Sequence, residues 1–226
     1  MISEEYIQMK KSLHLICLAL AALILFSSCA RGNKFAAEGL GFVDKKTNIT
    51  YNFAPLCYEP IILGDKIYGS DGDIDFYEIM GQDPQMWLGD ADGGVFYAQG
   101  ITLPTLDKMN VTRIEICTVG SALLVRDRIT EPDQISAIIT EYMSEEKLIY
   151  PNTAANASYK LRFADSSLDI YYCLEFFRYS GGYITTKDGK EINHGTDFLY
   201  NRSEDRFVKA PLALSEYINA LIGDSD

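Results

Sequence analysis

Apolar and polar residues alternate over short runs along most of the chain after residue 40, and this spacing predicts β-strands. Three stretches have the form of an antiparallel hairpin, with strand-like runs on both sides of a polar or glycine-containing turn: residues 42–53, 86–99 and 113–129. Further strand-like runs lie between residues 159 and 210, separated by turn signals at Gly181–Gly182 and Asp188–Gly189. The pattern therefore predicts a fold made mostly of strands.

The strand-like run 171–179 is unusual because neither of its faces is plainly polar. Alternation places Tyr171, Cys173, Glu175, Phe177 and Tyr179 on one face, and Tyr172, Leu174, Phe176 and Arg178 on the other. A central strand covered on both sides would explain this pattern, and an aromatic patch that contacts a partner is the alternative. Tyr179, Tyr183 and the single tryptophan, Trp87, are the candidate ligand contacts, with a place in the core as the alternative.

Residues 130–143 and 208–222 instead show the apolar spacing of helices with one buried face. In the first segment, Thr130 is expected to cap the helix and Pro132 to lie in its first turn. The apolar positions of that segment are Ile135, Ile138, Ile139, Tyr142 and Met143. A constant offset aligns Pro132 with Pro211, and all five of these positions with apolar residues of the second segment.

This match predicts an α+β fold with two pseudo-repeated halves, each an antiparallel sheet that ends in a helix packed on it. The alternative is one sheet with two unrelated covering helices. The predicted parts are a signal segment at residues 1–28, a linker at 29–39, a first half at 40–150 and a second half at 151–226.

The N-terminal segment has the three-part plan of an export signal. Lys10 and Lys11 precede an apolar run from Leu13 to Phe26 that only His14 interrupts, and Cys29 follows two serines. The run is about 14 residues long, whereas a membrane-spanning helix needs about 20. Two acidic residues precede the lysines, so Met9 is the expected start of the signal, with Met1 as the alternative.

The sequence LFSSC at residues 25–29 resembles the lipobox of bacterial prolipoproteins. That resemblance implies a diacylglycerol on the sulfur of Cys29 and removal of residues 1–28. It places the protein at the cell membrane, anchored by lipid and facing outside the cytoplasm. An ordinary cleaved signal that happens to end at a cysteine is the alternative. A linker over residues 30–39 can span at most about 35 Å, so the folded part would lie close to the membrane.

The chain carries a formal net charge of −12 at pH 7. An acidic surface repels phosphate backbones and anionic headgroups, which argues against nucleic-acid binding and makes the lipid the only expected membrane contact. Beyond Cys29 the cysteines are Cys57, Cys117 and Cys173, each in an apolar, strand-like context. We expect buried free thiols, with one disulfide among them as the alternative.

Candidate chemistry concentrates in two acidic, glycine-containing stretches. Asp71, Asp73 and Asp75 alternate in the first, and Asp90 and Asp92 flank Ala91 in the second. Alternating carboxylates can wrap a calcium ion, but the first stretch has Phe76 and Gln82 where an EF-hand loop needs glycine and glutamate. Aspartate and glycine also form good hairpin turns without any ligand. We therefore expect turns, with a calcium site as the alternative.

Catalytic motifs are scarce in the sequence. His194 is the one histidine beyond the signal segment, and no GxSxG elbow, HExxH or glycine-rich phosphate loop is present. Two functions remain open. We expect a non-catalytic lipoprotein that binds a protein, peptide or glycan, and the alternative is a cell-envelope hydrolase that uses carboxylates with or without a divalent cation. Collection of the aspartates in one pocket with His194 would favour the enzyme.

Overall fold

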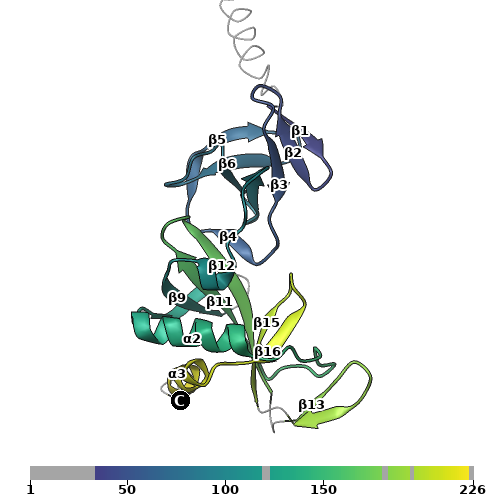
Figure 1. Cartoon of the computed structure of the whole chain (residues 1–226), viewed down its shortest axis with the longest axis vertical. Helices are drawn as coiled ribbons and strands as arrows, with labels where there is room; N and C mark the ends of the chain where they lie inside the picture. The colour runs from purple at the N-terminus through teal and green to yellow at the C-terminus, as the bar shows by residue number, and fades with distance from the viewer. Residues whose placement is uncertain (1–33, 119–122, 180–182, 194–195, 224–226) are drawn as a thin grey trace, which may run out of the picture.

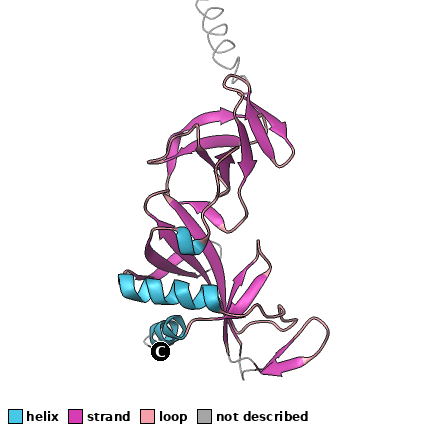
Figure 2. Cartoon of the chain, in the orientation of Figure 1, coloured by secondary structure: helices cyan, strands magenta, loops and turns pink. Residues whose placement is uncertain are grey.

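The computed structural model describes residues 34–118, 123–179, 183–193 and 196–223. They form two seven-stranded antiparallel sheets and a separate two-stranded hairpin, with two helices packed on the second large sheet (Figures 1 and 2). The α+β, β-rich class predicted from the sequence is confirmed. The signal segment, Cys29, His194 and the turns at Gly120 and Gly181 lie outside the described residues.

The first sheet contains seven strands from residues 35–98 in the order β1-β2-β3-β8-β7-β6-β5. Their bounds are β1 Phe35–Glu38, β2 Gly41–Asp44, β3 Thr50–Phe53, β5 Leu63–Ser70, β6 Asp75–Ile79, β7 Trp87–Asp90 and β8 Val95–Ala98. The hairpins expected at residues 42–53 and 86–99 are β2–β3 and β7–β8. The predicted linker 29–39 includes β1, so its residues from Phe35 onward belong to the sheet.

This sheet curls until its two edge strands touch. A Cβ atom on Gly69 of β5 would lie 2.4 Å from the ring of Phe35 in β1, and Lys34 lies over the ring of Tyr68 at 3.3 Å. Phe35 is fully buried among other aromatic rings at the centre of the curl. We call this curled sheet the N-terminal barrel, which is the rounded part at the top of Figure 1.

The second sheet also contains seven strands. Six follow the order β10-β9-β11-β12-β15-β16, and β4 pairs with β12. Their bounds are β4 Tyr58–Pro60, β9 Val111–Thr118, β10 Leu124–Ile129, β11 Ala157–Asp165, β12 Ile170–Arg178, β15 Asp197–Asn201 and β16 Arg206–Lys209. The third predicted hairpin is β9–β10. A separate hairpin joins β13 (Tyr183–Thr185) to β14 (Glu191–Asn193), with Gly189 at a φ of 80° in its turn.

Both helices pack on one face of the second sheet. Helix α2 spans Pro132–Ser144, α3 spans Leu212–Gly223, and a short 3-10 helix, η1, spans Leu106–Lys108. Ile138 of α2 and Ile218 of α3 are fully buried in a core that includes Ile116 of β9. The same core continues to Trp87 of the barrel, so the two sheets share it.

The boundary between the two predicted halves falls inside the second sheet. Strand β9 precedes residue 150 and β11 follows it, yet they pair along six residues. Both helices contact the same core, and so the structure provides one sheet for the two helices instead of one each. The pseudo-repeat stays a prediction.

The N-terminus of α2 differs from the expected one. The N-cap is Glu131, without a side-chain hydrogen bond, because Pro132 is the first helical residue. Thr130 therefore lies one position too early to cap the helix. Met143, expected on the buried face, is 40% exposed, while Ile135, Ile138 and Tyr142 are buried as predicted.

Candidate functional site

Several turns of the barrel gather at one of its ends. Neighbouring strands run in opposite directions, so successive turns alternate between the two ends of the sheet. The β1–β2, β5–β6 and β7–β8 turns therefore lie at the same end, together with Phe53 at the end of β3. Both acidic stretches identified in the sequence belong to these turns.

A pocket of about 400 Å³ opens between these turns, and we call it the barrel-end pocket. Four phenylalanine side chains line it: Phe42, Phe53, Phe76 and Phe96. Three of these rings are almost completely buried, and Phe53 is half-buried at the wall. Leu40 in the β1–β2 turn and Ile74 in the β5–β6 turn also line the pocket, although they are 88% and 42% exposed. Exposed apolar side chains around a hollow are typical of a binding surface.

Two of the predicted aspartates, Asp71 and Asp90, line this pocket together with the phenylalanines. Asp71 Oδ1 accepts hydrogen bonds from the backbone N–H groups of Asp73 and Ile74, at 3.0 and 2.9 Å. Asp90 Oδ1 accepts them from Asp92 and Gly94, at 2.9 and 2.7 Å. These bonds are those of Asx turns, so each carboxylate shapes its own turn and is held at the pocket by it.

A second pocket, of about 180 Å³, shares Phe53 and Asp90 with the first. Its other lining residues include Asp92 and Gly94 from the β7–β8 turn, Leu56 from the connection into the second sheet, and Glu59 of β4. We call it the junction pocket, because it lies where the barrel meets the second sheet. Leu56 is 66% exposed. The two pockets therefore adjoin, with Phe53 and Asp90 between them.

The turns around the barrel-end pocket are strongly acidic. Residues 37–41, 70–75 and 90–94 contain no lysine or arginine. They contain six carboxylate residues: Glu38, Asp71, Asp73, Asp75, Asp90 and Asp92. In a concave site, charges of one sign add to a potential that attracts ions of the opposite sign.

The aspartates do not assemble a metal site among the residues that the structure describes. No group of three or more histidine, cysteine, aspartate or glutamate side chains is placed there to hold an ion. Asp73 is exposed in the β5–β6 turn, and Asp75 begins β6. The structure thus brings Asp71 and Asp90 to one pocket, and the predicted partner His194 lies outside the described residues.

The aromatic candidates occupy different environments. Trp87 and Tyr179 are each 3% exposed and belong to hydrophobic clusters, whereas Tyr183 of β13 is 61% exposed. The phenylalanines of the barrel-end pocket were not predicted as site residues, because their convergence depends on the pairing of distant strands. The sequence shows only that Leu40, an apolar residue, stands between two glycines, and this does not reveal where the phenylalanines meet.

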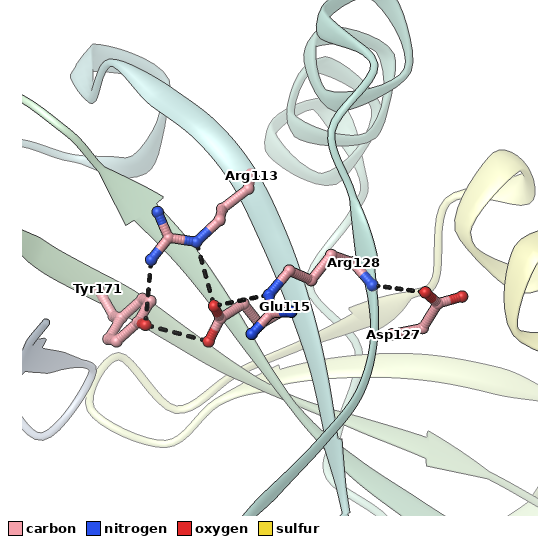
Figure 3. Close-up of polar contacts among 5 residues, drawn as sticks. All are labelled: Arg113, Glu115, Asp127, Arg128 and Tyr171. Atoms are coloured by element: carbon pink, nitrogen blue, oxygen red, sulfur yellow. Dashed lines mark hydrogen bonds and ion pairs between the residues drawn. The ribbon is translucent and has the colours of Figure 1, made fainter.

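A second polar cluster lies on the face of the second sheet that the helices leave free (Figure 3). The buried carboxylate of Glu115 accepts hydrogen bonds from Arg113, Arg128 and the hydroxyl of Tyr171, at 3.1, 3.2 and 3.0 Å. Beside it, Glu59 pairs with Lys160 and Arg162. Each of these carboxylates already has two cationic partners. The Glu115 contacts therefore join β9, β10 and β12, and the Glu59 contacts join β4 and β11, as an internal network of the sheet.

The three cysteines of the described residues are free and buried. Burial raises the pKa of Cys173 to about 12, despite the opposing effect of Lys160 and Arg162. A thiol with so high a pKa stays protonated at neutral pH and is a poor nucleophile. These positions agree with the expected role of the cysteines as small hydrophobic residues.

The chain matches no family model, no curated protein and no solved structure. Among the described residues, no helix is long and apolar enough to cross a membrane.

Proposed function

We propose that the protein is a lipid-anchored binding module of the cell envelope, and that it holds its partner at the barrel-end pocket. The observation that carries this proposal is the pocket itself, in which phenylalanine rings and two exposed apolar side chains surround a hollow at the mouth of a curled sheet. Pockets of this size, mostly apolar and with a few charged groups, are typical ligand sites.

The composition of the pocket supports binding over hydrolysis. Apart from Asp71 and Asp90, its lining consists of hydrocarbon side chains and glycine. Such a lining offers no serine, cysteine or histidine for nucleophilic catalysis. The Oδ1 atom of each aspartate already accepts hydrogen bonds from backbone N–H groups of its own turn. A hydrolase at this lining would have only Asp71 and Asp90 for proton transfer, and each of them also holds its own turn.

The path of the chain supports an outward-facing pocket. The carbonyl of Lys34 accepts a hydrogen bond from the N–H of Lys45 in the β2–β3 turn, which lies at the opposite end of the barrel from the pocket. With lipid on Cys29, the five residues 30–34 would connect the anchor to Phe35, a span of at most about 20 Å. The anchor would then hold the far end of the barrel at the membrane and leave the pocket open to the aqueous side.

Site-specific photo-crosslinking in intact cells tests this proposal. A photoreactive residue at Leu40 is expected to give a distinct crosslinked product, because that side chain is 88% exposed beside the pocket. The matched control is the same residue at Leu212 of α3, which is 64% exposed and remote from the barrel. Equal products from both positions, or none from Leu40, would contradict a binding role for the pocket.

A further inference from the structure

We infer that the ligand of the barrel-end pocket is a basic polypeptide segment, and that one of its lysine or arginine side chains enters the pocket. This inference rests on the proposed binding function and adds the chemical class of the partner. Three properties of the site point to it: its charge, its aromatic wall and its extent.

The charge of the site selects a cation. Six carboxylate residues surround the pocket within turns that contain no basic residue, and two of them, Asp71 and Asp90, belong to its lining. Their Asx-turn hydrogen bonds fix the carboxylates in place, so little side-chain freedom is lost when a cation binds beside them.

The walls select an organic cation over a metal ion. Calcium requires six to eight oxygen ligands, whereas this lining consists mainly of phenylalanine, leucine, isoleucine and glycine. An ammonium or guanidinium group instead interacts favourably with the face of an aromatic ring. The hydrocarbon stem of lysine or arginine can at the same time cover apolar surface, here that of Leu40 and Ile74. Phe53, half-buried at the wall, is the ring best placed for such a contact.

The extent of the site selects a chain over a small amine. The junction pocket continues from the barrel-end pocket across Phe53 and Asp90, and it adds a further apolar side chain, Leu56, and the carboxylate of Asp92. One ammonium group with a short stem would occupy only the first pocket. A polypeptide segment in which basic and apolar side chains alternate can occupy both pockets, and can bury Leu56 as well as Leu40.

A binding titration with a synthetic peptide tests the inference on the detergent-solubilised full chain. The probe is acetyl-Gly-Lys-Leu-Lys-Gly-amide, and its control is the same peptide with both lysines Nε-acetylated, which keeps the length and removes the charge. We expect the charged peptide to bind at least about tenfold more tightly, and its affinity to fall as salt rises.

The site of binding is tested with the double variant Asp71→Asn, Asp90→Asn. Asparagine keeps the Oδ1 acceptor of each Asx turn, so the turns stay intact while two charges disappear. We expect affinity for the charged peptide to fall about fivefold, in line with the modest strength of partly exposed ion pairs. The matched control is Asp65→Asn, Asp83→Asn, which removes two charges from the body of β5 and from the opposite end of the barrel and should leave the affinity unchanged.

Each outcome decides between the possibilities. Equal binding of the charged and acetylated peptides would overturn the cationic class while leaving a ligand pocket in place. If both double variants lose the same affinity for the charged peptide, the effect comes from the net charge of the protein, and the barrel-end pocket is not the binding site. If n-butylammonium binds as tightly as the charged peptide, the ligand need not be a polypeptide, and that part of the inference is wrong. Absence of peptide binding, together with a specific crosslink from Leu40, would overturn this inference and not the binding function.

Discussion

At the scale of single residues, Glu115 shows how a buried charge is kept ionised. Burial raises the pKa of its carboxyl group, but the hydrogen bonds from Arg113, Arg128 and Tyr171 outweigh that effect and hold the pKa below its ordinary value of 4.5. A carboxylate whose pKa is lowered by folding stabilises the folded state at every pH above its unfolded pKa. That contribution is lost as the pH falls through the folded pKa.

The replacement Glu115→Gln is therefore expected to lower the free energy of unfolding by about 2 kcal/mol at pH 7, since it leaves two guanidinium groups facing an uncharged amide. The difference from the wild type should shrink below about pH 4.5 and disappear at lower pH, where wild-type Glu115 is protonated as well. Urea unfolding from pH 7 to pH 3 measures both effects.

The matched control for this residue is Glu175→Gln. Glu175 lies on the same face of the sheet and pairs with Arg202 at 2.8 Å, but the two side chains are 32% and 67% exposed. An exposed pair contributes little, so the control should change the stability by less than about 0.5 kcal/mol. If both variants lose a similar free energy of unfolding, the Glu115 network stabilises the protein no more than an exposed ion pair does.

At the scale of elements, closure of the barrel depends on contact between β1 and β5. The position of Gly69 leaves no room for a Cβ atom, because the ring of Phe35 is fully buried and cannot move aside. We expect Gly69→Ala to destabilise the protein by about 2 kcal/mol, which is typical of overpacking. Gly64→Ala on the same strand meets only ordinary contacts at 3.6 Å and more, and should be nearly neutral. Thermal unfolding of both variants checks this, and equal melting temperatures would exclude a tight β1–β5 contact.

Elements whose partners are close in sequence were the predictable part of the fold. Both helices and three hairpins follow from local spacing and turn residues, and the burial of both faces of β12 follows from the aromatic alternation in 171–179. The sequence predicts a linker in place of strand β1, because FAAE contains one large apolar residue, Phe35, whose burial depends on β5 more than thirty positions away. The pairing of β4 with β12 is non-local in the same way.

The candidate site, like the fold, could be predicted only where its features are local in the sequence. Asp71 and Asp90 stood out in the sequence because aspartate beside glycine marks a turn. That both turns belong to one end of the barrel follows only from the strand order, which also brings Phe42, Phe76 and Phe96 beneath them. Their ring centroids lie 3.9 to 5.1 Å apart although the residues come from β2, β6 and β8. No local pattern in the sequence contains that information.

At the scale of the whole molecule, the proposed anchor and the pocket depend on different parts of the chain. A net charge of −12 gives the protein no attraction to anionic lipid, so attachment would depend on the acyl chains at Cys29. The barrel and the second sheet share one core, and the described chain enters the barrel at the end away from the pocket. Loss of the anchor should therefore release the protein without changing the pocket.

The replacement Cys29→Ser tests the anchor, because serine offers no sulfur for the diacylglycerol. We expect the protein to leave the detergent phase in a two-phase partition, or to remain as uncut precursor of higher mass. Cys17→Ser is the matched control, since Cys17 lies in the middle of the apolar run and not at the end of LFSSC. It should leave processing and partition unchanged. If Cys29→Ser partitions like the wild type, the lipid anchor is excluded, while the protein should still bind the charged peptide because the pocket lies at the other end of the barrel.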